Sequence, residues 1–232
     1  MQKEIADKIL VETEQGYDSM AVKFSDTRKY FWRGLEFIAD YAKNEDKILD
    51  FGCGNGRLLE LFNDKKIDYY GTDVSEKLIE LAQQKYVSAR FFKTNPSQTS
   101  LAFTDEFFNA VYSIAVFHHF PSKKYREDIT RELYRITKKD GQIIITVWNL
   151  WQKRYIKNIL KNWKNKLLGK SILDWNDCYI SFTDNADNKF QRFHHAFTKR
   201  ELKNLFKEAG FEVEKCEIVN GRNILLIAKK KG

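Results

Sequence analysis

Three glycines alternate with other residues in a short segment that could hold a nucleoside-containing ligand. The segment reads Asp50-Phe51-Gly52-Cys53-Gly54-Asn55-Gly56 and directly follows the apolar run 48–49. Glycine lacks a Cβ and tolerates positive φ, so a ligand can approach the backbone of such a turn closely. Asp73 ends the next apolar run, at about the distance where a ribose-binding carboxylate is expected. The spacing predicts a nucleoside-containing cofactor over residues 52–56.

Two adjacent histidines, His118 and His119, follow the apolar run 107–115. If that run is a strand of a parallel sheet, both residues stand near its carboxyl end, where open α/β sheets bind their ligands. Imidazole changes its protonation near neutral pH and can donate or accept hydrogen bonds. We therefore expect these histidines on the substrate side of the pocket; the alternative is that one of them packs and hydrogen-bonds a loop.

These residues need elements that position them, and the apolar pattern predicts alternating strands and helices. Strands are expected at 48–51, 68–73, 89–93, 107–115 and 141–148. Helices are expected at 3–22 (one, or two short ones), 27–41, 57–63, 76–86, 122–138 and 198–209. Such alternation is typical of a parallel, doubly wound α/β sheet.

The chain closes with two strand-like runs, 212–219 and 223–229, joined by Asn220-Gly221-Arg222. Asn-Gly between such runs is a strong signal for a β-hairpin. The last strand is therefore expected to run antiparallel to its neighbours, which is unusual for a dinucleotide-binding fold.

Length and composition favour one domain over residues 1–232, with N-terminal helices at 1–44 and an insert at about 149–190. No Gly/Ser-rich linker or low-complexity segment divides the 232 residues. The three cysteines lack C-x-x-C spacing, which argues against zinc and a disulfide framework and suits the reducing cytoplasm. We expect no metal site, no signal peptide and no membrane span.

The insert is strongly basic. Residues 149–173 include no acid and seven basic residues: Lys153, Arg154, Lys157, Lys161, Lys164, Lys166 and Lys170. Four large apolar residues recur at every fourth position, which predicts an amphipathic helix with a basic face: Trp151, Tyr155, Ile159 and Trp163. With a net charge of +8, this favours RNA, whose phosphates segment 153–170 would contact. The alternatives are a lid helix packed on the domain and a helix lying on a membrane surface.

The glycine segment and the terminal hairpin together resemble class I S-adenosylmethionine-dependent methyltransferases. The third glycine comes one residue earlier than in the dinucleotide motif G-x-G-x-x-G. The resemblance implies a Rossmann-like seven-stranded sheet, mostly parallel with an antiparallel terminal strand and helices on both faces. It also implies S-adenosyl-L-methionine as the cofactor. A nicotinamide enzyme with an imperfect fingerprint is the alternative.

The same resemblance implies roles at the cofactor. Asp50 would hold its ammonium group, directly or through water, and Asp73 would accept hydrogen bonds from both ribose hydroxyls. In such enzymes the glycine loop passes under the amino-acid end and the ribose of the cofactor. The resemblance therefore implies binding roles for Gly52, Cys53, Gly54 and Gly56. The alternatives are that Asp50 is a buried acid satisfied by backbone N–H groups and that Asp73 belongs to a helix-entry turn.

The remaining cofactor contacts come from the ends of other strands. The resemblance implies that Val74 lies against the adenine of the cofactor and that Ala115 and Val116 border its methionine part. The acid that commonly binds the adenine amino group has no clear counterpart after the strand at 89–93. Asn95 or Ser97 would take its place.

Four segments are similar to the eukaryotic tRNA wobble-uridine methyltransferases, which methyl-esterify 5-carboxymethyluridine: 17–28, 113–120, 141–148 and 191–197. A carboxylate is already an adequate nucleophile, so such an enzyme must mainly align it and exclude water. The resemblance implies that four residues hold this acid in one crevice: Arg28, His118, Arg192 and His194. For each of them, surface charge or core packing is the alternative.

The wobble-uridine resemblance implies a tRNA substrate and a small zinc-binding activating partner. Two other functions stay open. One is a methyltransferase of a small molecule, such as a metabolite, a quinone precursor or a lipid. The other is a non-catalytic RNA-binding or partner subunit with a vestigial cofactor pocket, which cofactor titration would distinguish from an enzyme.

Overall fold

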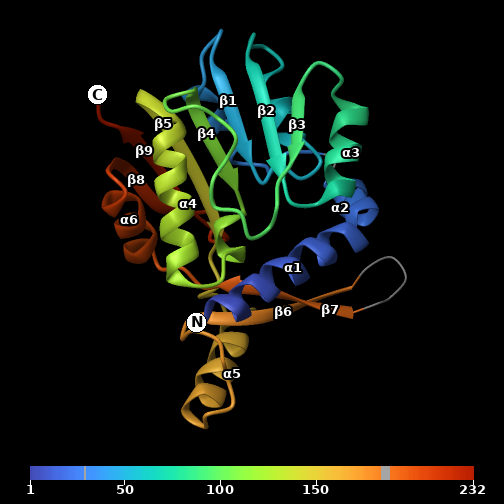
Figure 1. Ribbon diagram of the computed structural model, residues 1–232, viewed down its shortest axis with the longest axis vertical. Coiled ribbons are helices and arrows are strands. Elements are labelled where there is room, and N and C mark those ends of the chain that lie inside the picture. Colours follow the sequence, from blue (N-terminus) through green and yellow to red (C-terminus); the bar gives the residue numbers. More distant parts are fainter. Residues whose placement is uncertain (29, 184–188) are drawn as a thin grey trace.

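The computed structural model describes residues 1–28, 30–183 and 189–232. A seven-stranded sheet in the order β3-β2-β1-β4-β5-β9-β8 forms its centre (Figure 1). Its strands are β1 (Lys47–Phe51), β2 (Asp68–Asp73), β3 (Arg90–Lys93), β4 (Phe108–Ile114), β5 (Thr137–Trp148), β8 (Phe211–Val219) and β9 (Asn223–Lys230). β1 to β5 pair in parallel, whereas β9 is antiparallel to both β5 and β8. The predicted fold class is confirmed.

Helices cover both faces of the sheet. One face carries α4 (Lys123–Ile136), α6 (Lys199–Glu208) and part of α1 (Lys3–Ser19), and the other carries α3 (Glu76–Lys85) and the 3-10 helices η1 (Glu36–Tyr41) and η2 (Arg57–Phe62). Alternation along β5 explains the two cores: Ile143 and Ile145 face the first, and Ile144 faces the second. The sheet is thus buried on both sides, as a parallel sheet requires.

Local signals in the sequence set several element ends. The Oγ of Ser75 accepts the Leu78 N–H at the start of α3, and Thr198 caps α6 in the same way. Asn220 and Gly221 both have positive φ, 51° and 67°. Two central residues with positive φ suit the tight turn that joins β8 and β9.

The single helix predicted at 27–41 is wrong. The structure instead has α2 (Ala21–Thr27) and, after a turn, η1. Gly34 lies in this turn with a φ of 84°, a left-handed conformation that a helix does not continue through. Tyr30 is 83% exposed, so the aromatic residues of this stretch do not form one packing face.

The insert contains more than the predicted amphipathic helix. α5 (Ile156–Leu167) is followed by β6 (Asp177–Thr183) and β7 (Lys189–His195), which pair antiparallel as a second, two-stranded sheet. Trp151 and Tyr155, predicted as helix residues, precede α5. The hairpin was not predicted because β7 carries alternating polar residues whose burial depends on distant partners. No helix in the described ranges is long and apolar enough to cross a membrane.

Candidate active site

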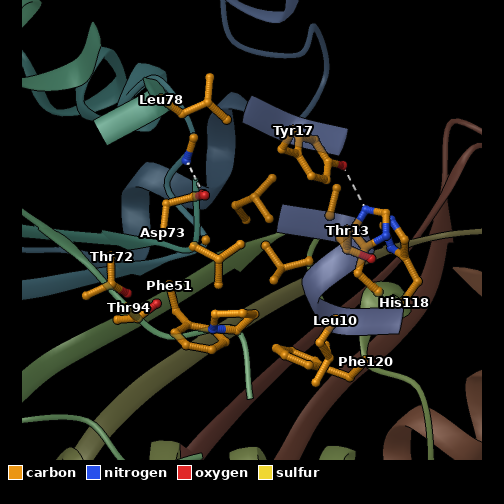
Figure 2. Close-up of a pocket in the computed structure, with 18 of the residues that line it drawn as sticks. Leu10, Thr13, Tyr17, Phe51, Thr72, Asp73, Leu78, Thr94, His118 and Phe120 are labelled. Atoms are coloured by element: carbon orange, nitrogen blue, oxygen red, sulfur yellow. Dashed lines mark hydrogen bonds between the residues drawn. The ribbon is translucent and has the colours of Figure 1, made fainter. Parts of the chain in front are cut away.

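A pocket opens at the carboxyl ends of the parallel strands, between the sheet and α1. About 1050 Å³ of space within it is not filled by protein atoms, including the part open to solvent. The ends of β1, β2 and β4 border it on one side, and Leu10, Thr13 and Tyr17 of α1 border it on the other. In Figure 2, Asp73 lies toward one end of the pocket, and Tyr17 and His118 lie toward the other. This is the position expected for a ligand of an open α/β sheet.

The glycine loop forms a close-fitting surface at the end of β1. Gly52, Gly54 and Gly56 have φ values of 79°, 54° and 75°. A Cβ on Gly52 would lie 2.3 Å from Cγ2 of Val116, so no other residue fits there without displacing the pocket wall. Gly52 and Gly54 line the pocket, and their bare backbone provides the close approach that a nucleoside cofactor requires.

Asp73 lies at the end of β2, and each of its carboxylate oxygens accepts a hydrogen bond from a backbone N–H. The N–H of Gly54 donates to its Oδ2 at 2.8 Å, and the N–H of Ser75 donates to its Oδ1 at 2.9 Å. Burial raises the pKa of Asp73, and these N–H groups lower it in part. Each oxygen has a second lone pair, so the carboxylate can accept one ribose hydroxyl on each oxygen.

Asp50 lies behind the loop and is 2% exposed. The hydroxyl of Tyr69 donates to its Oδ2 at 2.5 Å. Burial raises the pKa of Asp50 to about 7, against the opposing effect of the Tyr69 hydrogen bond. Asp50 is not among the residues that line the pocket, so of the two predicted modes of contact with the ammonium group, the geometry favours the one through water.

The residues that come after β3 in the chain form the opposite rim of the cofactor end of the pocket. Asn95 lines the pocket and Ser97 does not. The N–H and the hydroxyl of Ser97 both donate to Oδ1 of Asn95 at 3.1 Å, which occupies that oxygen. Gln98 also lines the pocket, and its amide nitrogen donates to the Ser100 carbonyl at 2.5 Å. The Gln98 side-chain oxygen is therefore available as an acceptor, which is what an adenine amino group needs.

Three buried histidines meet at the other end of the pocket: His118, His119 and His194. Their nearest ring nitrogens lie within 4.8 Å of one another, and the rings of His118 and His194 stack with centroids 5.0 Å apart. Burial lowers the pKa of each, and the nearby charge of Arg192 lowers it further, for His119 to about 3. All three are therefore neutral at physiological pH.

Each neutral imidazole has one donor and one acceptor nitrogen. His118 accepts the Trp148 N–H on Nδ1 at 3.3 Å, so its Nε2 bears the hydrogen. No partner for this buried N–H lies in the part of the chain that the structure describes. His119 accepts the Tyr17 hydroxyl on Nε2 at 2.8 Å. Two of the three acceptor lone pairs are thus occupied, and the cluster is arranged for hydrogen bonding; we assign no metal to it.

Arg192 projects from β7 into the same end of the pocket and is 4% exposed. Its guanidinium lies over the ring of Phe182 at 4.6 Å and near that of Trp148 at 5.6 Å. Its Nε–H is buried and has no hydrogen-bond partner among the described residues. Within the described ranges, no carboxylate lies at ion-pair distance from Arg192 or from Arg28. Burial and the charge of Arg192 lower the pKa of Arg28, which places the two cations close together.

Most of the residues predicted for the site do line this pocket: Arg28, Gly52, Gly54, Asp73, Val74, Asn95, Ala115, Val116, His118 and Arg192. Four predicted residues do not line it: Asp50, Cys53, Gly56 and His194. Ala115 has a φ of 64°, a strained conformation that occurs where surrounding structure fixes a functional turn.

Sequence reasoning missed the contribution of α1. Tyr17, Thr13 and Leu10 line the pocket from this helix, although only the Tyr17 segment was noticed and no role was given to it. The signal was weak, because a tyrosine in an amphipathic helix usually indicates packing. Trp148, at the end of β5, was also missed and could have been found from its position at a strand's carboxyl end.

The glycine cradle, the ribose-compatible Asp73 and the fold define a class I S-adenosylmethionine-dependent methyltransferase, and S-adenosyl-L-methionine is its cofactor. A family model described as a methyltransferase domain matches residues 24–215. The match covers most of the chain, and the chain therefore belongs to this methyltransferase-domain family.

Curated relatives make the similarity more specific. The chain is 28% identical over 207 residues to a tRNA (carboxymethyluridine(34)-5-O)-methyltransferase of Schizosaccharomyces pombe, covering 84% of this chain and 86% of that protein. It is 31% identical over 159 residues to an Arabidopsis thaliana protein of the same description, covering 68% of this chain and 37% of that protein. The chain spans about a third of the length of this Arabidopsis protein and of three mammalian relatives described as probable tRNA methyltransferase 9B.

Solved structures agree on the fold. A SAM-dependent methyltransferase of Methanosarcina mazei has a TM-score of 0.71 and 23% identity, covering 87% of this chain and 99% of that one. A putative methyltransferase of Haloferax volcanii, solved with the Trm112 methyltransferase activator, has a TM-score of 0.68 and 15% identity, covering 95% and 98%.

Proposed function

We propose that this chain methyl-esterifies the carboxylate of a 5-carboxymethyl group on a tRNA wobble uridine. The observation that carries the proposal is a cationic lining: Arg28 and Arg192 both line the pocket with no carboxylate at ion-pair distance among the described residues. Beside them, the buried Arg192 Nε–H and His118 Nε2–H have no hydrogen-bond partner in the described ranges. An unpaired buried donor is costly, and two of them beside a cation without a counter-ion fit an anionic group such as a carboxylate.

The charge balance of the pocket supports an anionic substrate. Three arginines line it, Arg28, Arg57 and Arg192, against the single acid Asp73. Among the described residues, no acid lies within the ion-pair distance of 4.0 Å from any of these three arginines. One guanidinium can meet the cofactor's own carboxylate, which leaves cationic groups for the substrate.

The proposed reaction requires little proton transfer by the protein. S-adenosylmethionine, when bound, supplies an electrophilic methyl group, and a carboxylate can attack it without a general base. No histidine is therefore needed as a base, and the Nε2–H of His118 is assigned as a hydrogen-bond donor. Arg192 and His118 would orient the acid, while Phe120 and Trp148 line an apolar wall that helps to exclude water.

The insert supports an RNA substrate. Six of its basic residues are exposed along and around α5: Lys153, Arg154, Lys157, Lys161, Lys164 and Lys170. Trp151 and Trp163 pack in a small core with Leu150 and Ile159, so the apolar stripe supports the insert and does not present aromatic rings for bases. Its basic face stays free to contact phosphates. α5 projects beyond the sheet and the hairpin (Figure 1).

We also propose a small activating partner protein, since the Haloferax volcanii relative of this fold was solved with such an activator. Co-expression with a candidate activator, followed by assay of methyl transfer, tests this. A tRNA substrate agrees with the predicted cytoplasmic location, which cell fractionation tests.

The experiment that tests the proposed function is incubation with methyl-labelled cofactor and bulk tRNA, followed by mild alkali and nucleoside analysis. We expect label on the wobble uridine that mild alkali releases, since an ester hydrolyses and an N-methyl or C-methyl group does not. An alkali-stable methyl group elsewhere in tRNA, or transfer only to small molecules, would contradict the proposal. No measurable cofactor binding would support a non-catalytic subunit instead.

A further inference from the structure

We propose that Tyr17 is a positioning residue that orients the guanidinium of Arg192 toward the substrate. The proposal rests on the proposed function, because Arg192 is the group expected to receive the substrate's carboxylate. Tyr17 comes from α1 and Arg192 from β7, yet Arg192 Nη1 lies 3.4 Å from the Tyr17 hydroxyl oxygen. Both side chains line the pocket.

The direction of the Tyr17 hydrogen bond follows from its neighbours. The backbone carbonyl of Phe193 can only accept, so His119 donates to it from Nδ1, at 2.9 Å. His119 is neutral, which makes its Nε2 an acceptor. The Tyr17 hydroxyl must then donate its hydrogen to His119 Nε2, 2.8 Å away, and its lone pairs remain for the N–H of Arg192.

The hydrogen bond between Arg192 and Tyr17 is directional, whereas the contacts of Arg192 with the surrounding aromatic rings are not. Phe182, Trp148 and Tyr17 contact the guanidinium through their faces, with centroids 4.6 to 5.9 Å away. Such contacts hold the position of the planar group and only weakly fix its rotation. Among the described residues, the Tyr17 hydroxyl is the side-chain acceptor within hydrogen-bond distance of this guanidinium. It engages Nη1 and so fixes the rotation of the guanidinium plane.

The end of α1 is anchored independently of this hydroxyl. The Oγ of Ser75 donates to Oδ1 of Asp18 at 2.5 Å, and the N–H of Lys77 donates to the same oxygen at 3.3 Å. The Tyr17 ring also packs edge-on against Phe24, with centroids 5.8 Å apart. Replacing Tyr17 with Phe would keep these contacts, so the substitution isolates the hydroxyl.

The first test compares Tyr17→Phe with wild type on an RNA that carries 5-carboxymethyluridine. We expect kcat/KM to fall about tenfold, the order of one lost hydrogen bond to a charged group, with the cofactor Kd unchanged. Tyr125→Phe is the matched control, because its hydroxyl also holds α1, through Asp7, but lies away from Arg192. A general loosening of α1 would lower activity in both variants.

The second test asks whether Tyr17 acts through Arg192. In Arg192→Gln, adding Tyr17→Phe should cause no further loss; two losses that multiply would contradict the proposal. The ¹⁵N resonances of His119 Nε2 and Arg192 Nε should both shift in Tyr17→Phe, and unchanged resonances would overturn the proposal without any substrate. Failure of the wild-type protein to methylate carboxymethyl RNA would instead overturn the proposed function.

Discussion

Two acids at the ends of neighbouring strands, Asp50 and Asp73, face different surroundings. Asp73 lines the pocket and is fixed by two backbone N–H groups. Asp50 lies behind the glycine loop, bonded to Tyr69. We therefore expect direct contact with the cofactor from Asp73 and an electrostatic effect from Asp50.

Asp73→Ala should weaken cofactor binding by about 3 kcal/mol, or roughly 100-fold, because two hydrogen bonds to a charged acceptor are lost. Isothermal titration with S-adenosylmethionine measures this. Asp73→Asn keeps one acceptor oxygen and should lose less. An unchanged Kd in Asp73→Ala would contradict the assigned ribose contact.

Cofactor affinity should depend on pH through Asp50. Burial raises the pKa of Asp50 to about 7, and the cofactor's ammonium group favours the ionised acid. The acid is protonated below this pKa, so the Kd should rise as pH falls below about 7, by up to about tenfold per pH unit. Asp50→Asn should remove this dependence. Equal pH profiles of the two proteins would contradict the role of Asp50.

At the residue scale, the sequence predicts the cofactor end better than the substrate end. The glycine loop and Asp73 are close in the chain and follow one local pattern, so spacing alone places them together. Arg192 and Tyr17 are 175 residues apart, and only the folded hairpin and α1 bring them into contact. The partner of His119 is likewise invisible without the fold.

The hairpin that carries Arg192 is itself held by a buried charge network at its base. His195 contacts Asp177 from Nδ1 and Glu201 from Nε2, each at 2.7 Å. Each ring nitrogen of His195 thus meets a carboxylate oxygen. Arg126 lies 3.8 Å from Glu201. β6, β7, α6 and α4 are thereby joined on the side of β7 opposite Arg192 and His194.

Glu201→Ala should destabilise the protein by about 2 kcal/mol, because it removes the acceptor of His195 Nε2 and the carboxylate beside the buried Arg126. Burial raises the pKa of Glu201, but the hydrogen bond and charge of His195, with Arg126, outweigh it and lower the pKa below the ordinary 4.5. This stability is therefore present above about pH 4.5 and lost as pH falls through the lower, folded-state pKa. Urea unfolding measures both effects.

Glu208→Ala, on the same helix but exposed, is the control for Glu201→Ala and should change stability little. If both substitutions had equal effects at neutral pH, the network would not stabilise the hairpin. The expected order is a large loss for Glu201→Ala, a smaller one for Glu201→Gln, which keeps an acceptor oxygen, and almost none for the control.

Elements with a strong local signal were predicted well, and those that depend on distant partners were not. Ser75 and Thr198 mark helix starts through their own hydroxyls, and Asn220-Gly221 marks the terminal turn. In contrast, Gly34 interrupts the stretch predicted as the helix 27–41, and apolar periodicity alone did not detect this. The strands β6 and β7 have polar faces that only the pocket and the charge network bury.

On the scale of the whole molecule, the basic residues of the insert stand on an element that projects from the sheet (Figure 1). Replacing Lys157, Lys161 and Lys164 with Gln should weaken tRNA binding and reduce the slope of log Kd against log salt by about 2, since each phosphate contact contributes about 0.7 to 0.9. Filter binding over a salt series measures this.

The matched control for the insert replaces three exposed lysines elsewhere, Lys139, Lys203 and Lys207. It removes the same charge from the protein and should leave the slope nearly unchanged. An equal change in both triple variants would show that net charge, and not the insert, attracts the RNA. Cofactor affinity should stay unchanged in both.

The most direct test of the proposed function compares two anticodon stem-loops that differ only in the carboxymethyl group on the wobble uridine. Each is incubated with the protein, the proposed activating partner and S-adenosylmethionine, and product mass is read by mass spectrometry. We predict that the carboxymethyl RNA gains one methyl group, which mild alkali removes, and that the unmodified RNA gains none. Methylation of both RNAs, or of neither, would contradict the assignment of the carboxylate as the acceptor.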